Sequence, residues 1–268
     1  MYHQKELLQT NFYPFFNIQC GENECELKLK MQGDGHNNPI SSQNSYWSEI
    51  TGLYWAWKNI QQTKYIGLCS YRRFFNFKES SNPVKLCKQK DASAHLLNVS
   101  YEYIDRIFKE HDVILPIEYT YSKSVHRVCE INYNQKDFEL LEAYISNHQP
   151  EYSDAYGKIM NKNKMIGHNM FIMKYEDFID YCEWVFEILI PLSKVIDATN
   201  YPTNQIRVFG YMHELLLAVY IQKKDMKIKR SQILYVNDSI SKVRFSSITY
   251  RLLCTIVYNL KKLLNSSI

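Results

Sequence analysis

Two adjacent arginines, Arg72 and Arg73, are the side chains of this sequence best suited to bind an anion. They stand in the run KYIGLCSYRRFF, directly after an apolar stretch at residues 65–69 that has the length and composition of a buried strand. The guanidinium group keeps its charge and binds carboxylate or phosphate oxygens in pairs. The arginines, with Tyr71 beside them, therefore indicate a diphosphate site. An ion pair with acids elsewhere in the chain explains the same residues equally well, so both interpretations stay open.

A polar loop at residues 32–45 precedes the arginines and is rich in Gly, Asn and Ser. Its Asp34 and Asn44 side chains could hydrogen-bond a sugar or a ribose, although ordinary surface loops carry the same residue types. Glu49 follows in an apolar segment of helical periodicity, where a carboxylate needs a partner. Either arginine could be that partner.

Four polar residues later in the chain are further candidates for a ligand site. His168 and Asn169 open an apolar segment, and Arg207 and Glu214 lie seven residues apart in a segment of helical periodicity. That spacing brings both residues near one helix face. A carboxylate so placed could act as a general base, or it could be the ion-pair partner of Arg207. A lone histidine such as His168 is more often structural than catalytic.

Short apolar segments alternate along the chain with segments of helical periodicity. Strand-like segments lie at residues 65–69, 112–116, 168–174, 226–228 and 233–236. Helical periodicity covers residues 46–60, 100–112, 135–148, 151–162, 175–192 and 204–222, while residues 78–94 are charged and irregular. We expect an α/β fold with a mostly parallel central sheet covered by helices on both faces. Ligands of such sheets bind beyond the carboxyl ends of the strands, where the two arginines lie.

The bulk properties narrow the class of protein. A chain of 268 residues that is 46% hydrophobic and 15% aromatic can bury a sizeable core, and its net charge of +4 gives no reason to expect a nucleic-acid partner. Its seven cysteines are scattered, which fits a reducing, cytoplasmic compartment. The sequence shows neither a signal peptide nor an apolar run long enough to span a membrane.

Residues 241–268 differ from the rest of the chain, because they are apolar, carry five basic residues and contain no acid. We expect a basic amphipathic helix. It would either attach the protein to the inner face of the cytoplasmic membrane or pack on the preceding domain. The expected organisation is therefore one domain at residues 1–240, followed by this tail.

Several segments, in this order, resemble the DUF4422 family of bacterial capsular and surface polysaccharide glycosyltransferases. They are ISSQNSYWSEITGLYWAWKN, YIGLCSYRRFF, DVILP, PEYSDAYGKIMN, HNMFIMKYEDFIDYCEWVFEIL and IRVFGYMHELLL. The resemblance covers about residues 30–235. It implies a single GT-A-like, Rossmann-type domain and a nucleotide-sugar donor, expected to be a UDP-sugar.

The resemblance also implies the transferred group and its acceptor. Galactose, as pyranose or furanose, is the candidate sugar. The acceptor would be an oligosaccharide or lipid-linked glycan of a capsule, lipopolysaccharide or lipooligosaccharide. Metal-dependent sugar transferases commonly hold a divalent ion with an Asp-x-Asp pair, which this sequence lacks, so we name no metal ligands and leave metal dependence open.

On this interpretation the candidate residues take distinct roles. Donor-binding residues would be Tyr71, Arg72, Arg73, Asp34 and Asn44. The sugar and acceptor would be bordered by Glu49, His168, Asn169 and Arg207, and Glu214 would be the catalytic base.

The sequence departs from the family pattern at named places. Ser70 stands where relatives usually carry a histidine, and only His126 remains of a His-His pair expected near residues 121–132. The first strand of the family is also expected ahead of the position where this chain begins. These departures support an alternative, a degenerate relative that binds a nucleotide or sugar without catalysis.

Overall fold

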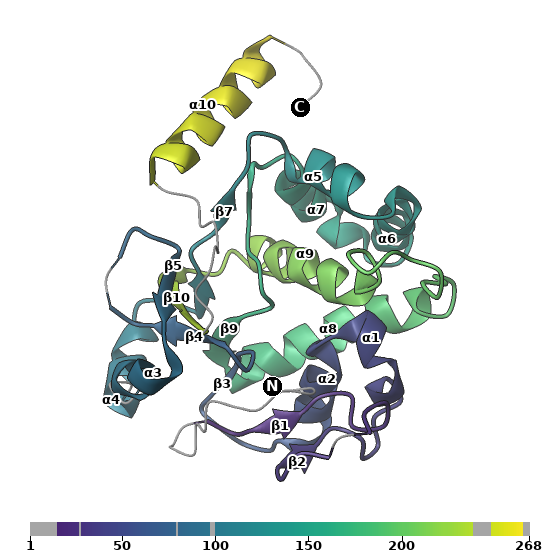
Figure 1. Cartoon of the computed structure of the whole chain (residues 1–268). Coiled ribbons are helices and arrows are strands. Elements are labelled where there is room, and N and C mark those ends of the chain that lie inside the picture. Colours follow the sequence, from purple (N-terminus) through teal and green to yellow (C-terminus); the bar gives the residue numbers. More distant parts are fainter. Residues whose placement is uncertain (1–14, 27, 79, 97–99, 238–247, 265–268) are drawn as a thin grey trace. The chain divides into compact units, whose positions relative to one another are not determined.

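The computed structural model describes residues 15–26, 28–78, 80–96, 100–237 and 248–264 (Figure 1). The chain divides into two compact units that interleave along the sequence. The first unit comprises residues 1–117, 168–182 and 227–245, and the second comprises residues 118–167, 183–226 and 246–268. The expected boundary at residue 240 lies outside the described residues and stays a prediction.

The first unit contains most of the strands. They are β1 (Ile18–Gln19), β2 (Gln32–Gly33), β3 (Tyr65–Leu68), β4 (Arg73–Asn76), β5 (Val84–Cys87), β6 (Val113–Pro116), β9 (Phe171–Lys174) and β10 (Ile228–Val236). Its helices are η1 (Ser41–Gln43), α1 (Asn44–Trp47), α2 (Ile50–Asn59), α3 (Gln89–Leu96) and α4 (Tyr101–Ile107). Helix α8 (Tyr175–Leu192) begins in the first unit and ends in the second.

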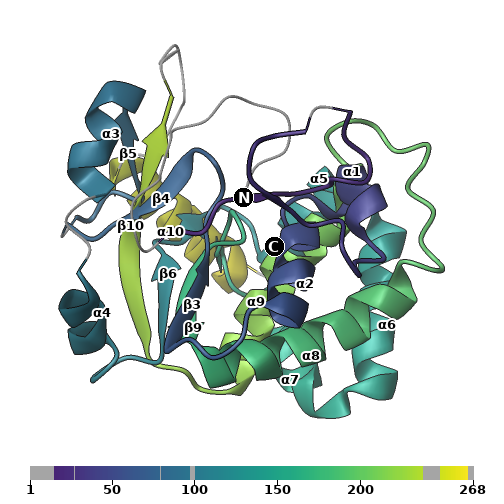
Figure 2. The ribbon, with the colours of Figure 1, turned by 90° about the horizontal axis from the view of Figure 1, so that it is seen from below.

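Six strands of the first unit form its main sheet, in the order β3-β9-β6-β10-β4, with β5 also paired to β10 (Figure 2). The α/β class is confirmed, but the sheet is mixed where we expected it to be mostly parallel. β5 and β6 run parallel to β10, whereas β4 runs antiparallel to β10 and β9 runs antiparallel to both β3 and β6. A mostly parallel sheet needs a long connection, usually a helix, between successive strands. Between β3 and β4 the chain makes only a short turn, in which two residues separate Ser70 from Arg73 at the start of β4.

Both faces of this sheet are covered by apolar side chains. Phe74 and Leu234 pair across β4 and β10 and pack in one core cluster. Their neighbours Phe75 and Ile233 pack in a second cluster, which includes side chains of α4. Successive residues of a strand point to opposite faces of the sheet, so the adjacent Phe74 and Phe75 pack in different core clusters.

The second unit is mainly helical. It contains β7 (Tyr119–Thr120), β8 (Lys164–Met165), α5 (Val125–Asn132), α6 (Gln135–His148), η2 (Pro150–Tyr152), α7 (Ser153–Met160), α9 (Val208–Lys223) and α10 (Ile248–Leu263). Helix α9 is buried along most of its length and on most sides, and it packs closely on α7. A helix that is apolar nearly all round is a core helix, and α9 is the core of this unit.

Candidate functional site

The two arginines are fixed by the turn between β3 and β4. The N–H of Arg73 donates to the carbonyl of Ser70 at 3.1 Å, which closes the turn. Arg73 then begins β4 and pairs with Tyr235 of β10, while the carbonyl of Arg72 accepts from the N–H of Val236 at 2.8 Å. The prediction that the arginines lie just past the end of a strand is confirmed, and their backbone is held on both sides.

The guanidinium groups of both arginines have buried donors with no acceptor among the described residues. The Nε atoms of Arg72 and Arg73 are buried and make no hydrogen bond to the residues that the structure describes. Among those same residues, no carboxylate forms an ion pair with either arginine. The predicted ion-pair alternative, including a pair with Glu49, therefore finds no support in the described part of the chain. An anion with several acceptor oxygens would satisfy these donors.

Aromatic rings hold the two guanidinium groups in place. Both lie over the ring of Tyr235, with the carbon Cζ of Arg72 at 5.6 Å and that of Arg73 at 5.7 Å from the ring centre. Arg72 also lies 4.9 Å from the ring centre of Tyr71. Such contacts favour a cation without neutralising it. Sequence reasoning missed Tyr235, because only the pairing of β10 with β4 brings it here.

His168 lies close enough to Arg73 for the charge of the arginine to act on it. Burial and, to a lesser extent, the charge of Arg73 together lower the pKa of His168 to about 3. The imidazole is therefore neutral at physiological pH and can both donate and accept one hydrogen bond. One predicted sugar-binding residue is therefore within electrostatic range of one predicted diphosphate-binding residue, Arg73.

Two consecutive residues before β9 have a left-handed backbone. His168 has a φ of 73° and Asn169 a φ of 51°, values that cost free energy in residues other than glycine. Both residues were expected within a strand, but they form a turn ahead of Phe171, where β9 starts. Asn169 is buried, and its Nδ2 donates to Oε1 of Glu49 at 3.3 Å. Strained turns of this kind cluster at binding sites.

Asp34 and Asn44 have structural partners in their own loop region. Asp34 is buried and accepts hydrogen bonds from the N–H of Gly21, the N–H of Glu22 and the hydroxyl of Ser41, at 2.9, 2.9 and 2.7 Å. Asn44 donates to the carbonyl of Ser48 and the hydroxyl of Thr51. These contacts shape the loop, and the donor-binding role of both residues stays a prediction.

Glu214 and Arg207 belong to the second unit. Arg207 is exposed at the N-terminal end of α9. Glu214 is half-buried on α9, and a Cβ built on Gly167 would lie 4.0 Å from its Oε2 and 3.0 Å from the ring of Tyr119. The glycine therefore lets the chain pass close to the ring and the carboxylate. Arg207 is the N-cap residue of α9, and its carbonyl accepts from the N–H of Tyr211 at 3.1 Å, while the expected common face of Arg207 and Glu214 stays a prediction.

Tyrosines gather around Glu214. Burial and then the charge of Glu214 raise the pKa of Tyr121 to about 12. Burial and then Glu214 also raise the pKa of Tyr133, whose ring stacks on that of Tyr211 at 4.5 Å between centres. A carboxylate among tyrosine hydroxyls can both accept a proton and orient a hydroxyl-rich ligand.

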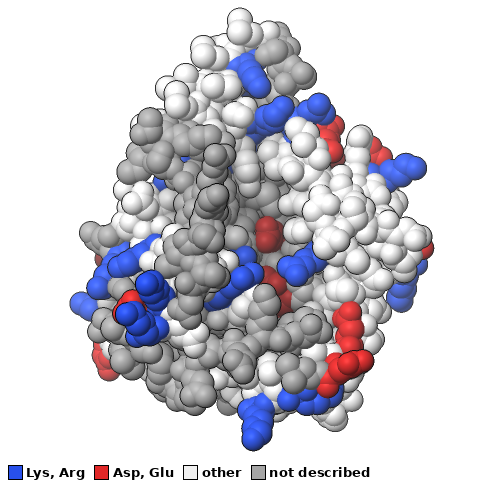
Figure 3. All heavy atoms as spheres, in the orientation of Figure 1, with Lys and Arg blue, Asp and Glu red and all other residues white. Residues whose placement is uncertain are grey.

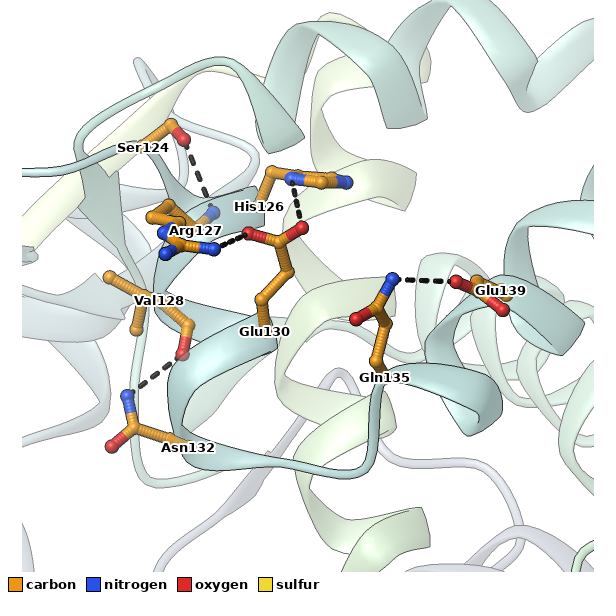
Figure 4. Close-up of polar contacts among 8 residues, drawn as sticks. All are labelled: Ser124, His126, Arg127, Val128, Glu130, Asn132, Gln135 and Glu139. Atoms are coloured by element: carbon orange, nitrogen blue, oxygen red, sulfur yellow. Dashed lines mark hydrogen bonds and ion pairs between the residues drawn. The ribbon is translucent and has the colours of Figure 1, made fainter. Parts of the chain in front are cut away.

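His126 is engaged on the surface of α5. Ser124 caps this helix by accepting from the N–H of Arg127, and Nδ1 of His126 lies 3.7 Å from Oε1 of Glu130 (Figure 4). The other carboxylate oxygen of Glu130 pairs with Arg127 at 2.8 Å. In the parts of the chain that the structure describes, no group of three or more His, Cys, Asp or Glu residues could hold a metal ion.

An apolar cavity of about 610 Å³ lies in the first unit, along β3. Its walls include Phe74, Phe75, Trp55 and Tyr65, and Ser70 borders it. Trp55 Nε1 and the Ser70 hydroxyl are buried and make no hydrogen bond to the described residues. Sequence reasoning singled out Ser70 only through the family pattern and did not indicate the cavity.

Comparisons with known proteins agree with this fold. The solved apo structure of the WbbM bifunctional glycosyltransferase matches with a TM-score of 0.75 and 25% sequence identity, over 87% of this chain. The match covers 45% of the WbbM chain, so this chain spans less than half of that protein. No curated protein matches the sequence. The family model for the domain of unknown function DUF4422 matches residues 1–225, and the chain therefore belongs to the DUF4422 family.

Proposed function

We propose that this protein is a glycosyltransferase that holds the diphosphate of a nucleotide-sugar donor on Arg72 and Arg73. The observation that carries the proposal is the pair of buried Nε atoms for which the described residues offer no acceptor, on a turn whose backbone is hydrogen-bonded on both sides. The likeness to the WbbM glycosyltransferase supports the reaction class.

The chemistry follows from the charge that develops during transfer. The bond between the anomeric carbon and the diphosphate oxygen breaks, and a new bond forms from the anomeric carbon to an acceptor hydroxyl oxygen. The leaving nucleoside diphosphate gains negative charge, which two fixed guanidinium groups stabilise without reorganisation. The proton of the acceptor hydroxyl would pass to a base, for which Glu214 is our candidate.

His168, on which the charge of Arg73 acts, is neutral, and the next residue, Asn169, is hydrogen-bonded to Glu49. We assign them to hydroxyl groups of the donor sugar. We propose a UDP-sugar as donor, with galactose as pyranose or furanose as the transferred hexose. The proposed acceptor is a growing surface glycan, lipid-linked or free.

The test is turnover by the purified full chain. Release of UDP from a panel of UDP-sugars would be measured with oligosaccharide and lipid-linked acceptors, with and without manganese. We expect one sugar to support turnover, and the Arg72→Ala/Arg73→Ala double variant to lose at least about a hundredfold in kcat/KM. The control Arg106→Ala/Lys109→Ala removes the same charge from exposed residues of the same unit. Equal activity of the two double variants would refute the diphosphate role.

A second candidate function is binding without catalysis. Ser70 stands where relatives usually carry a histidine, and this observation favours it. Nucleotide binding that is lost in the arginine variant, together with no turnover of any donor by the unaltered chain, would establish this alternative.

A further inference from the structure

Helix α10 packs on the second unit through a narrow face. Cys254 and Tyr258, four residues apart, are its buried side chains in the described part of the helix. The hydroxyl of Tyr258 donates to the carbonyl of Asn161, and the helix also contacts β7. These contacts fix which side of the helix faces the unit.

The opposite side of α10 is apolar and exposed. Its side chains are exposed by 37% at Val257 to 80% at Leu263. The exposed apolar residues are Leu252, Leu253, Ile256, Val257, Leu260, Leu263 and Leu264. Because residues three and four apart share a helix face, they form one continuous stripe. A helix that packed its apolar stripe on its own domain would bury these residues, but the described part of the chain leaves them exposed and thus accessible to another partner.

The charge around the stripe has one sign. Arg251, Lys261 and Lys262 are the charged residues of α10, and residues 241–268 contain no acid. Lys162 and Lys164 are exposed, and they follow directly in the sequence after Asn161, whose carbonyl accepts the hydrogen bond from Tyr258 of α10. Helix α10, at the top of Figure 3, presents mostly uncharged surface interrupted by basic side chains.

We propose that the outer face of α10 binds the surface of a bilayer that contains anionic phospholipid. A helix with an apolar stripe and basic flanks lies in the plane of the interface, with the stripe among the acyl chains and the cations at the headgroups. No helix in the described residues is long and apolar enough to cross a membrane. A second copy of the chain fits this face less well, because a symmetric pair would bring like charges together with no acid on α10 to offset them.

The lipid contact does not depend on the proposed enzymatic activity. If both hold, α10 brings the enzyme to a lipid-linked acceptor. Binding to vesicles is measured without turnover, so failure of one proposal leaves the other intact.

The test is flotation of the full chain with phosphatidylcholine vesicles, with and without phosphatidylglycerol. The variant Leu253→Asp/Ile256→Asp/Leu260→Asp places three acids on the stripe. The matched control Ile131→Asp/Leu140→Asp/Val195→Asp places three acids on exposed apolar residues of the same unit, away from α10. We expect the unaltered chain and the control to bind anionic vesicles, and the stripe variant to bind at least about tenfold more weakly.

Two further measurements separate the alternatives. Lys261→Glu/Lys262→Glu is expected to weaken binding to anionic vesicles most at low salt, because exposed charges are screened at high salt. Circular dichroism checks that each variant is folded. The proposal is overturned if the unaltered chain does not bind anionic vesicles, or if the stripe variant binds them as well as its control does. A dimer in sedimentation velocity that only the stripe variant disperses, with no vesicle binding, would assign the face to a second copy instead.

Discussion

Asn169 donates a hydrogen bond from Nδ2 to Oε1 of Glu49 at 3.3 Å, and so joins the turn before β9 to the start of α2. The two residues are 120 positions apart in the chain. Both were predicted to border the sugar, and the fold brings them into direct contact. The same asparagine has a left-handed backbone, with a φ of 51°. One residue therefore combines a buried polar contact with a strained conformation.

We expect Asn169→Ala to lower the free energy of unfolding by about 2 to 3 kcal/mol. The variant loses a hydrogen bond to a carboxylate and keeps a left-handed backbone that alanine disfavours. Asn169→Gly loses the same hydrogen bond but relaxes the backbone, so it should be destabilised less. Urea unfolding of both variants measures the difference. A glycine variant that is less stable than the alanine variant would contradict the assignment of strain to this position.

Acid should destabilise the protein through buried histidines. Burial lowers the pKa of His213, which is fully buried on α9, to about 3, and the pKa of His168 moves in the same direction. In the unfolded chain these imidazoles are protonated near pH 6.5, whereas in the folded protein they are protonated only near pH 3. The free energy of unfolding therefore includes the full contribution of the neutral histidines above pH 6.5, and this contribution is lost as the pH falls toward 3.

At pH 5 protonation of His213 in the unfolded chain should lower the free energy of unfolding by about 2 kcal/mol, since 1.5 pH units separate pH 5 from the pKa of an unfolded histidine. His213→Gln should flatten the fall in stability between pH 6.5 and 4, measured by urea unfolding across this range. His148→Gln, at an exposed histidine of α6, is the matched control. If the two variants show the same dependence on pH, His213 is not the group responsible.

Asp34→Ala should destabilise the protein by about 3 kcal/mol or more. The change leaves two backbone N–H groups and one hydroxyl without their acceptor. Ser41→Ala removes only one of the three donors and should cost about 1 kcal/mol. Thermal and urea unfolding give both values. Equal, small effects would show that the loop does not depend on this carboxylate, and would favour its predicted role in donor binding.

Two glycines should respond to alanine in opposite directions. A Cβ on Gly67 of β3 would lie 2.6 Å from the carbonyl oxygen of Phe171 and 2.7 Å from Ile172 on β9, so Gly67→Ala must push the two strands apart. Gly157 lies in α7, where a Cβ would meet nothing within 4 Å. Gly157→Ala should therefore stabilise the protein by about 0.5 to 1 kcal/mol. Stabilisation by Gly67→Ala would contradict the close approach of β3 and β9.

Local patterns in the sequence predicted the elements well where periodicity is strong. The helix at residues 135–148 was predicted with the bounds that the structure has, and the strand expected at 65–69 is β3. Residues 78–94 were interpreted as irregular, yet they contain β5 and the first part of α3. Short strands such as β5 carry little periodicity, and their pairing with a distant strand decides their structure. The two strand signals at 226–228 and 233–236 belong to one strand, β10.

The sequence predicted those parts of the candidate site that depend only on where a strand ends. Arg72 and Arg73 stand just past β3 as expected, because a strand end is visible in the sequence. The place of Tyr235 beside the arginines and the effect of the Arg73 charge on His168 depend on sheet register, which a single sequence does not reveal. Of the partners of Asp34, Ser41 lies in the same polar loop, but Gly21 and Glu22 lie 13 and 12 residues earlier, so their hydrogen bonds are recognised only in the folded chain.

The central claim is that Arg72 and Arg73 bind the diphosphate of a donor nucleotide. Isothermal titration of UDP at fixed ionic strength tests it most directly, with the unaltered chain, Arg72→Ala/Arg73→Ala, and the charge-matched control Arg106→Ala/Lys109→Ala. We expect the control to bind like the unaltered chain and the arginine variant to bind at least about a hundredfold more weakly, since charged hydrogen bonds of this kind contribute about 1.5 to 3 kcal/mol each. An unchanged Kd for UDP in the folded arginine variant would contradict the account.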